Sequence, residues 1–311
     1  MILIDQIENH LPFPDENQLP DAVEEQQFEL TSKFELALED LDSLVGLADV
    51  KTEIRRMAYL MQMGLVRSRN GLKPLTISPH LTFSGNRGTG KKKVAQCVGK
   101  IYNEVGVLSK GHVIEARETD LFSGSVDDTI AKTLEVCNLC VGGILFLSDA
   151  FVFKEENREH IEASMRVIAD FAKVNEKDIA VIMSGSEIAT QVFSRTPLAI
   201  KLDFANKFKF QDYSPTDLKD LLVKSLLKFD YQITDEALSK VSLLFQRTPS
   251  DRDSTNVHRV QDLVKKLASA HAESLRLAET TDIMSLSVIT ADMVPAPGVL
   301  STNRGIIAGY L

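Results

Sequence analysis

The chain has 311 residues, of which 44% are hydrophobic and 25% are charged, and its net charge at pH 7 is −9. This length suggests two domains, and the composition is that of an ordinary globular protein. The acidity argues against a free-standing nucleic-acid-binding protein. No stretch approaches the ~20 apolar residues of a membrane span, and none has the pattern of a signal peptide. We therefore expect a cytoplasmic protein whose partners are neither membranes nor nucleic acids.

The three cysteines, Cys97, Cys137 and Cys140, do not indicate a zinc site. Cys137 and Cys140 form a C-x-x-C pair, but no second pair of Cys or His residues at metal-binding spacing follows. Three thiols without an export signal suit a reducing compartment. We interpret them as packing residues in helices and expect no metal site.

Residues 1–38 are acidic and contain prolines that interrupt any helix, namely Pro12, Pro14 and Pro20. This segment is interpreted as a partly ordered arm, or alternatively as a docking segment for a neighbouring subunit or another partner. The next segment, Val50 to Leu65, has the apolar periodicity of a helix that buries one face.

Strands and helices alternate through the middle of the chain. The apolar strand Pro79–Ser84 runs into a glycine-rich loop, and a helix is expected from Lys91 to Val105. Alternation of this kind implies an α/β fold with a parallel sheet covered on both faces. Further strands are expected at 113–116, 142–147, 178–183 and 207–210, and further helices at 129–140 and 159–174.

A small helical domain is expected after Tyr213. Ser214-Pro-Thr-Asp217 has an N-cap serine followed by proline at the first helical position. Helices are predicted at 218–228, 235–246 and 255–277, followed by a final short segment and a tail.

The loop from Gly85 to Lys92 reads Gly-Asn-Arg-Gly-Thr-Gly-Lys-Lys. It matches the Walker A motif, G-x-x-x-x-G-K-[ST], at every position except the last, and it lies between a strand and a helix as that motif requires. Backbone N–H groups of such a loop bind phosphate at a helix N-terminus. The candidate cofactor-binding residues are Gly85, Gly88, Thr89, Gly90, Lys91 and Lys92.

The last position of the motif, where a hydroxyl would hold Mg²⁺, is Lys92. Its ammonium group cannot ligate a metal, and it places a second cation, beside Lys93, where the metal would lie. A cation there can partly replace the metal electrostatically. Two interpretations stay open: the loop binds ATP or ADP with little contribution from Mg²⁺, or it is an empty relic.

Four segments make the chain resemble the AAA+ ATPases, and among them the group of red-type Rubisco activase (CbbX) and stage V sporulation protein K. They are Gly85–Lys91, Val105-Gly-Val-Leu-Ser-Lys-Gly-His112, Gly142-Gly-Ile-Leu-Phe146 with Asp149-Ala150, and Phe210-Gln-Asp-Tyr-Ser214. The resemblance covers residues 38–294. It implies an αβα sandwich of the P-loop NTPase type with a helical lid. The expected divisions are an arm at 1–38, an αβα nucleotide-binding-type domain at 39–213, a lid at 214–294 and a tail at 295–311.

The resemblance assigns Ile144–Leu147 to the Walker B strand, which the family follows with Asp-Glu. Here Ser148 stands where an Asp would hold the metal, and Asp149 stands where a Glu would activate water. Shifting the alignment by one residue makes Asp149 the metal ligand but places Ala150 at the catalytic position. Asp149 is thus the single candidate catalytic residue, and both protein contacts to the metal are missing.

Two arginines that the resemblance implies are also replaced. Lys201 and Asp203 lie near the expected arginine finger, a group that contributes about 10³–10⁵ in rate, and Lys201 lacks the planar fork of arginine. In the lid, His258 or Gln261 stands where a sensor arginine is expected. Arg259 is offset from that position by one residue, about 100° around the helix.

The family's pore loop, D-L-x-G-x-Y-x-G, corresponds to Asp120–Asp127 here. Ser125 stands at the position of the aromatic residue that grips a polypeptide. Phe122 is aromatic but lies three residues earlier, and we expect it to be buried.

Departures at all of these positions favour a degenerate AAA+ protein, or pseudo-ATPase. Such a protein binds ATP or ADP, hydrolyses it poorly or not at all, and acts as a scaffold or regulatory subunit. We expect it in a hexamer-type ring with itself or with an active AAA+ paralogue. One alternative is a slow or atypical ATP-hydrolysing remodeller of a protein client. The other is a nucleotide-state sensor without turnover.

Overall fold

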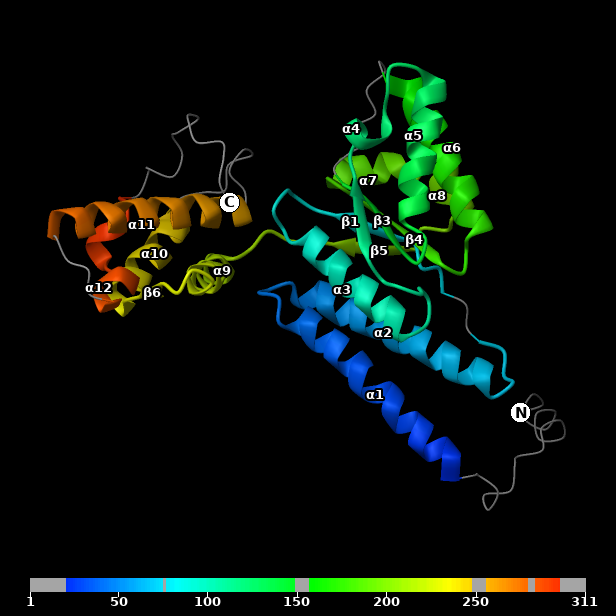
Figure 1. Ribbon diagram of the computed structural model, residues 1–311, viewed down its shortest axis with the longest axis horizontal. Coiled ribbons are helices and arrows are strands. Elements are labelled where there is room, and N and C mark those ends of the chain that lie inside the picture. The colour runs from blue at the N-terminus through cyan, green and yellow to red at the C-terminus, as the bar shows by residue number, and fades with distance from the viewer. Residues whose placement is uncertain (1–20, 75–76, 149–156, 248–255, 279–282, 297–311) are drawn as a thin grey trace, which may run out of the picture.

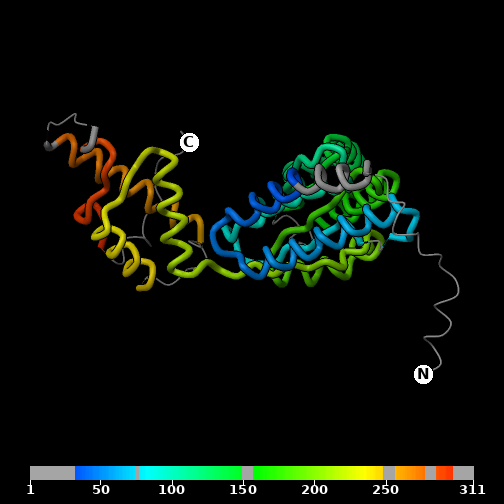
Figure 2. The backbone as a smooth tube through the Cα atoms, turned by 90° about the horizontal axis from the view of Figure 1, so that it is seen from below, coloured from blue at the N-terminus to red at the C-terminus, as the bar shows by residue number. Residues whose placement is uncertain are grey.

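The computed structural model of the protein describes residues 21–74, 77–148, 157–247, 256–278 and 283–296. A larger body built on a five-stranded sheet is followed by a smaller helical body (Figure 1). The two bodies lie side by side and are joined by the segment that leaves the last strand of the sheet, as the yellow-green trace in Figure 2 shows.

The strands of the larger body all run parallel, in the order β2-β3-β4-β1-β5. The two strands β3 and β4 are buried along their whole length, which explains their continuous apolar sequence. The predicted α/β fold with a parallel sheet is therefore confirmed. The strands are β1 Leu81–Ser84, β2 Val113–Ala116, β3 Gly143–Leu147, β4 Ile179–Gly185 and β5 Asn206–Lys209.

Helices cover both faces of the sheet (Figure 1). Because side chains alternate along a strand, β3 contributes to two separate cores. Ile144 and Phe146 pack with the first group of helices, whereas Leu145 and Leu147 pack with the second group. The first group is α1 Asp21–Asp42, α2 Ala48–Arg69 and α3 Lys91–Glu104. The second is α5 Val126–Leu139, α6 Arg158–Val174, α7 Glu187–Phe193 and α8 Pro197–Lys201, and the short α4 Glu118–Leu121 follows β2.

Helix α1 begins directly after Pro20 and continues to Asp42, so the division expected after residue 38 falls inside it. A proline disrupts a helix at its own position and in the preceding turn, so a helix can begin directly after Pro20. The apolar residues that follow Pro20 repeat with helical spacing. They pack into the core shared with α2 and α3. These residues are Phe34, Ala37, Leu38 and Leu41.

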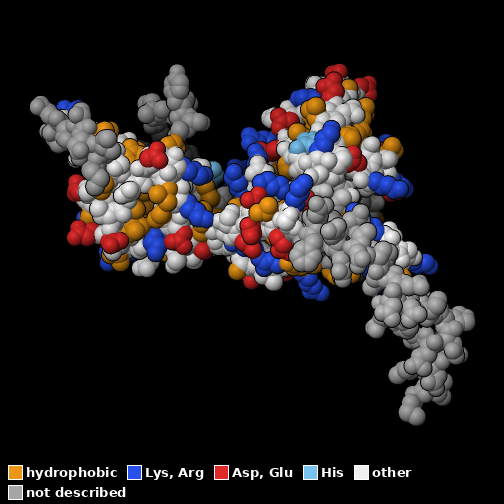
Figure 3. Space-filling view, turned by 60° about the horizontal axis from the view of Figure 1, so that its bottom comes forward, with side chains coloured by type: hydrophobic (Ala, Val, Ile, Leu, Met, Phe, Trp, Pro, Cys, Tyr) orange, Lys and Arg blue, Asp and Glu red, His pale blue; other side chains and the backbone are white. Residues whose placement is uncertain are grey.

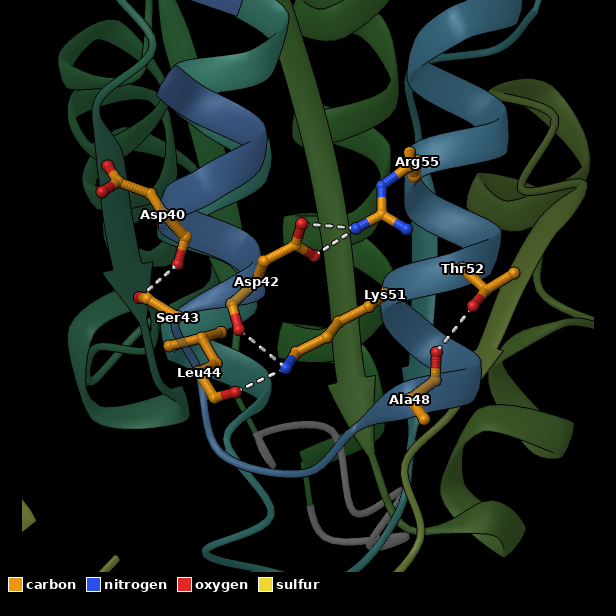
Figure 4. Close-up of polar contacts among 8 residues, drawn as sticks. All are labelled: Asp40, Asp42, Ser43, Leu44, Ala48, Lys51, Thr52 and Arg55. Atoms are coloured by element: carbon orange, nitrogen blue, oxygen red, sulfur yellow. Dashed lines mark hydrogen bonds and ion pairs between the residues drawn. The ribbon is translucent and has the colours of Figure 1, made fainter. Parts of the chain in front are cut away.

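The turn between α1 and α2 is held by two basic side chains of α2 (Figure 4). Arg55 forms an ion pair with the carboxylate of Asp42. Lys51 Nζ donates to the backbone oxygens of Asp42 and Leu44, at 3.0 and 2.5 Å. Burial lowers the pKa of Lys51, although the charge of Asp42 opposes that shift. These contacts fix the path of the chain as it approaches the glycine-rich loop.

The smaller body, or lid, packs three helices around a core of leucines, with Ile289 among them. Its first helix starts as the sequence predicts, because Ser214 Oγ accepts from Asp217 N and proline occupies the first turn. A short parallel ladder of β6 Gln232–Ile233 and β7 Val288–Ile289 closes the lid. Its helices are α9 Pro215–Leu227, α10 Asp235–Arg247, α11 Val257–Ala278 and α12 Ile283–Ser287, followed by a 3₁₀ turn at Ala291–Met293.

None of the helices in the described ranges combines the length and the apolar character needed to cross a membrane.

Candidate functional site

The glycine-rich loop leaves β1 at Ser84 and enters α3 at Lys91. Its glycines have positive φ angles, and two of them also lie too close to neighbouring atoms for any side chain. A Cβ on Gly85 would stand 2.5 Å from the backbone oxygen of Phe210, and one on Gly90 would stand 2.8 Å from the hydroxyl of Tyr213. Tertiary contacts as well as backbone geometry therefore require glycine at these positions.

Helix α3 opens with Gly90, and no side chain caps it. The N–H groups of its first turn and the helix dipole thus favour an anion at this end of the helix. Lys91 is only 7% exposed, and its Nζ donates to the backbone oxygens of Gly85 and Asn86 at 2.9 and 2.7 Å. Thr89 Oγ1 also donates to Asn86, at 2.8 Å. The loop is therefore preformed, with its lysine already turned toward it.

Lys92 forms an ion pair with Glu115 of β2, with 2.5 Å between Nζ and Oε2. Ser148, directly after β3, lies near enough to that carboxylate for its hydroxyl to help lower the carboxylate's pKa. Burial raises the pKa of Glu115, but the hydrogen bond from Lys92, the hydroxyl of Ser148 and the positive charges of Lys92 and Arg117 outweigh it, so the net pKa lies below its ordinary value. The residues that replace both metal contacts of the motif therefore share one ionised carboxylate.

The donor set at this point does not fit Mg²⁺, which prefers oxygen ligands in near-octahedral arrangement. Among the described residues, the one carboxylate here is that of Glu115, and it is already paired with the ammonium group of Lys92. In the part of the chain that the structure describes, no group of three or more His, Cys, Asp or Glu side chains is placed to hold a metal. Asp149, the candidate catalytic residue, and Ala150 lie outside the described residues.

The lid is bonded to the glycine-rich loop through Asn256. Its amide Nδ2 donates to the backbone oxygen of Arg87 at 3.2 Å and to Asp212 Oδ1 at 2.8 Å, and its Oδ1 accepts from Tyr213 N at 2.9 Å. Asn86 Nδ2 donates to the same Asp212 carboxylate at 3.0 and 3.1 Å. Asn256, only 2% exposed, therefore ties three segments together at the loop.

Basic side chains gather where the larger body faces the lid (Figure 3). This is the side from which the loop and the first turn of α3 are reached. Tyr213 lies beside it, and burial together with the charge of Asp217 raises the pKa of its hydroxyl to about 12, so the hydroxyl stays neutral. The site thus combines a glycine cradle, a helix N-terminus and positive charge, which is the chemistry of phosphate binding.

The positions that the resemblance gives to arginines hold residues with other contacts. Lys201, in α8, forms an ion pair with Asp170 of α6, and Asp203 is exposed. In the lid, His258 and Gln261 are exposed. Arg259 is buried, and burial lowers its pKa; its guanidinium carbon lies 5.4 Å from the ring centroid of Phe245. Arg259 therefore packs into the lid core.

Ser125, at the position of the pore aromatic, is the N-cap of α5, where its hydroxyl accepts from Asp128 N at 3.1 Å. Phe122 is half-buried against the second core, with its ring centroid 5.8 Å from that of His160. The expectation that Phe122 packs inward is confirmed in part, because some of the side chain stays exposed.

The cysteines are free and buried. Burial raises the pKa of the Cys137 and Cys140 thiols to about 12, which suits packing residues and not reactive ones. Cys97 lies in α3 and Cys137 in α5 as expected, whereas Cys140 follows the last residue of α5.

Sequence reasoning missed Glu115, Asp212 and Tyr213 as parts of the site. A charged residue inside the otherwise apolar strand Val113–Ala116 was the available signal, because a half-buried carboxylate requires a partner. Lys92, which looked like a loss in the motif, is that partner.

No family model matches the chain. It is 30% identical over 232 residues to a chloroplastic ribulose bisphosphate carboxylase/oxygenase activase of Cyanidioschyzon merolae, covering 74% of this chain and 76% of that protein. It is 27% identical over 267 residues to protein CbbX of Cereibacter sphaeroides, covering 84% and 86%. It is 28% identical over 258 residues to stage V sporulation protein K of Bacillus subtilis, covering 79% of each.

Among solved structures, the chain resembles the AAA domain of FIGL-1 in complex with ADP, with a TM-score of 0.55 at 14% identity, covering 81% of this chain and 80% of that one. It also resembles a RuvB mutant from Thermotoga maritima, with a TM-score of 0.51 at 15% identity, covering 81% and 69%. These similarities concern the fold. Together with the sequence relatives they place the chain in one family: it belongs to the AAA+ proteins that include CbbX, chloroplastic ribulose bisphosphate carboxylase/oxygenase activase and stage V sporulation protein K.

Proposed function

We propose that this AAA+ protein binds ATP or ADP without efficient hydrolysis and acts through its bound state, as a scaffold or regulatory subunit. Its partners in this proposal are copies of itself or an active AAA+ paralogue in a ring. The proposal rests on one observation above all: Lys92, at the position of the glycine-rich loop where a hydroxyl would contact the metal, forms an ion pair with Glu115.

Phosphoryl transfer in P-loop enzymes depends on a metal ion that bridges the outer phosphates and neutralises developing charge. In this chain the ammonium group of Lys92 supplies positive charge near that place, and its side chain is 53% exposed. A fixed cation can stabilise bound phosphates, but it cannot bridge them to protein oxygens as a divalent ion does. Binding is thus compatible with the residues present, whereas rapid turnover is not.

The remaining positions support the same proposal. Lys201 is engaged with Asp170, and Arg259 is packed beneath the lid surface. Lys201 has no guanidinium fork, and that of Arg259 lies over the ring of Phe245 in the lid. The cradle of Gly85, Gly90 and Lys91 supports retained binding, because it keeps the positive φ angles and the uncapped helix N-terminus that suit a bound phosphate.

The test is a calorimetric titration of the purified chain with ATP and ADP, with Mg²⁺ and with EDTA, beside a phosphate-release assay. We expect binding that Mg²⁺ changes by less than about threefold, or about 0.7 kcal/mol. We expect Lys91→Ala to weaken binding by about 10- to 100-fold, the contribution of a charge-assisted hydrogen bond. Lys93→Ala is the matched control, because it removes an exposed lysine from the same helical turn.

Absence of binding would favour the empty-loop interpretation and overturn the proposal. Turnover on the order of 1 s⁻¹ that requires Mg²⁺ would overturn it as well and would favour the ATP-hydrolysing remodeller. Binding without turnover, combined with unchanged assembly in every nucleotide state, would remove the regulatory part of the proposal.

A further inference from the structure

A groove of about 750 Å³ lies between α6 and the pair α7 and α8. These three helices cover the face of the sheet opposite α1–α3 (Figure 1). The floor of the groove is apolar and formed by buried side chains, and Val192 extends it at 42% exposure. The floor residues are Ile161, Met165, Ala169 and Leu198. A groove of this size and lining suits the apolar side chains of a short peptide.

The rim of the groove is basic. Four cations border it, and Glu162 is the one acidic residue among the lining side chains. Arg158 is paired with Glu162 and Lys201 with Asp170, whereas Arg195 makes no ion pair with any other described residue. The four cations are Arg158, Arg166, Arg195 and Lys201. An occupant with apolar residues and carboxylates would therefore match both the floor and the rim.

We infer that the occupant is residues 1–20 of the same chain. This segment carries four carboxylates, at Asp5, Glu8, Asp15 and Glu16, and has no Lys or Arg. Apolar residues such as Ile4, Ile7 and Leu11 lie between them. The other terminal segment outside the described ranges, 297–311, has the opposite character, because it contains Arg304 and no acidic residue. Charge complementarity thus selects the first segment.

Chain length permits this contact. The segment precedes α1 on the other side of the sheet, so it must pass around the larger body to reach the groove. Twenty residues span up to about 70 Å when extended, which exceeds the diameter of a small domain. Covalent linkage also raises the effective concentration of the segment to the millimolar range, so weak contacts suffice. The contact would give the acidic arm a defined role on the α6–α8 face.

The first test follows amide hydrogen exchange of the full chain. The comparison is with a full-length variant that carries Asp5→Asn, Glu8→Gln, Asp15→Asn and Glu16→Gln. We expect peptides from α6, α7 and α8 to exchange faster in the variant, by about tenfold at the most affected amides, while lid helices are unchanged. Equal exchange overturns the proposal. If the amides of α6, α7 and α8 are protected only at higher protein concentration, the occupant is a second copy of the chain, and the proposal is also overturned.

The second test uses a fluorescent peptide of residues 1–20 and the acid-neutralised full chain as receptor. Adding Arg166→Ser and Arg195→Ser to the receptor should raise the peptide Kd about tenfold, the effect of losing two exposed ion pairs. Lys173→Ser with Lys177→Ser removes the same charge outside the groove and should leave the Kd unchanged. A peptide of residues 297–311 should not bind. If the two receptor variants lose equal affinity for the peptide of residues 1–20, or if that peptide does not bind, the assignment of this segment to the groove is overturned.

Discussion

The contacts of Lys92 decide how the glycine-rich loop is understood. Considered alone, a lysine in place of the motif's hydroxyl means only that one metal ligand is missing. Paired with Glu115, it belongs to a local network in which the nearby carboxylate that the structure describes is already engaged by an ammonium group. The pairing is partly exposed, so its value for stability is small, and its effect on ligand choice matters more.

Restoring the two motif residues tests this view. The double variant Lys92→Thr, Ser148→Asp returns a hydroxyl and a carboxylate to the positions that hold Mg²⁺ in P-loop NTPases. We expect its ATP affinity to become at least about tenfold higher in Mg²⁺ than in EDTA, measured by calorimetry. Lys92→Met is the control, because it removes the cation without adding an oxygen. A double variant that stays indifferent to Mg²⁺ would contradict the role given to these positions.

The pH dependence of stability follows from the lowered pKa of Glu115, whose ordinary value is 4.5. A carboxyl with a lower pKa in the folded state stabilises the fold above its ordinary pKa, and this contribution is lost as pH falls through the folded value. We therefore expect the melting-temperature difference between the native chain and Glu115→Gln to be constant near neutral pH and to shrink below pH 4.5. Melting curves between neutral and acidic pH measure it. A difference that grows on acidification would be inconsistent with the network.

At the scale of elements, α1 shows how a polar segment becomes part of a core. Its sequence is acidic enough to suggest an arm, yet every third or fourth residue of its second half is apolar. Those residues face α3, and Lys100 of α3 forms an ion pair with Asp40 of α1 at 2.5 Å. The helix is thereby part of the larger body, and the chain that precedes Asp21 starts from a fixed point.

The packing of α1 predicts that two substitutions close together in the sequence lower the free energy of unfolding by very different amounts. Phe34 is 1% exposed and Leu36 is 59% exposed. Phe34→Ala should lower the free energy of unfolding by about 3–5 kcal/mol, because it leaves a cavity in the core. Leu36→Ala should change it by no more than about 0.5 kcal/mol. Urea unfolding measures both, and a tolerated Phe34→Ala would mean that α1 is not part of the cooperative fold.

On the scale of the whole molecule, the loop is the point where the two bodies meet. Asn256 and Asp212 bond to it from the lid side, Val257 N donates to Gly88 O at 3.3 Å, and Lys224 of α9 donates to Ser43 O at 2.6 Å. A ligand bound at the loop would touch groups fixed by both bodies. The position of the lid would then report on occupancy, as a protein acting through its bound state requires.

Loss of the Asn256 amide should loosen this connection. Asn256→Ala removes three hydrogen bonds at a buried position, and each group left without a partner costs about 1–3 kcal/mol. We expect faster amide hydrogen exchange in residues 85–90 and at the start of α11, with the interior of the lid unchanged. Gln261→Ala, on the exposed side of the same helix, is the control. If both variants exchange alike, the amide does not couple the two bodies.

The sequence by itself determined most of the architecture. Apolar runs located the three inner strands β1, β3 and β4 within one or two residues, because a central parallel strand has no alternative way to bury such residues. Turn and cap chemistry located the start of α9, and glycine spacing located the phosphate cradle. The short helices α7 and α8 and the ladder of β6 with β7 escaped prediction, since segments of two to seven residues carry too few turns for periodicity.

Only the tertiary structure decided what the altered positions do. Local sequence shows that Lys92, Lys201 and Arg259 differ from the family pattern, but their partners lie 23, 31 and 14 residues away. Those partners are brought close by strand pairing and helix packing, which no local signal encodes. The same holds for Asn256, whose contacts reach 169 residues back to the loop. Residue identity therefore indicated which positions depart from the family pattern, and the contacts between distant segments decided what those side chains bond to.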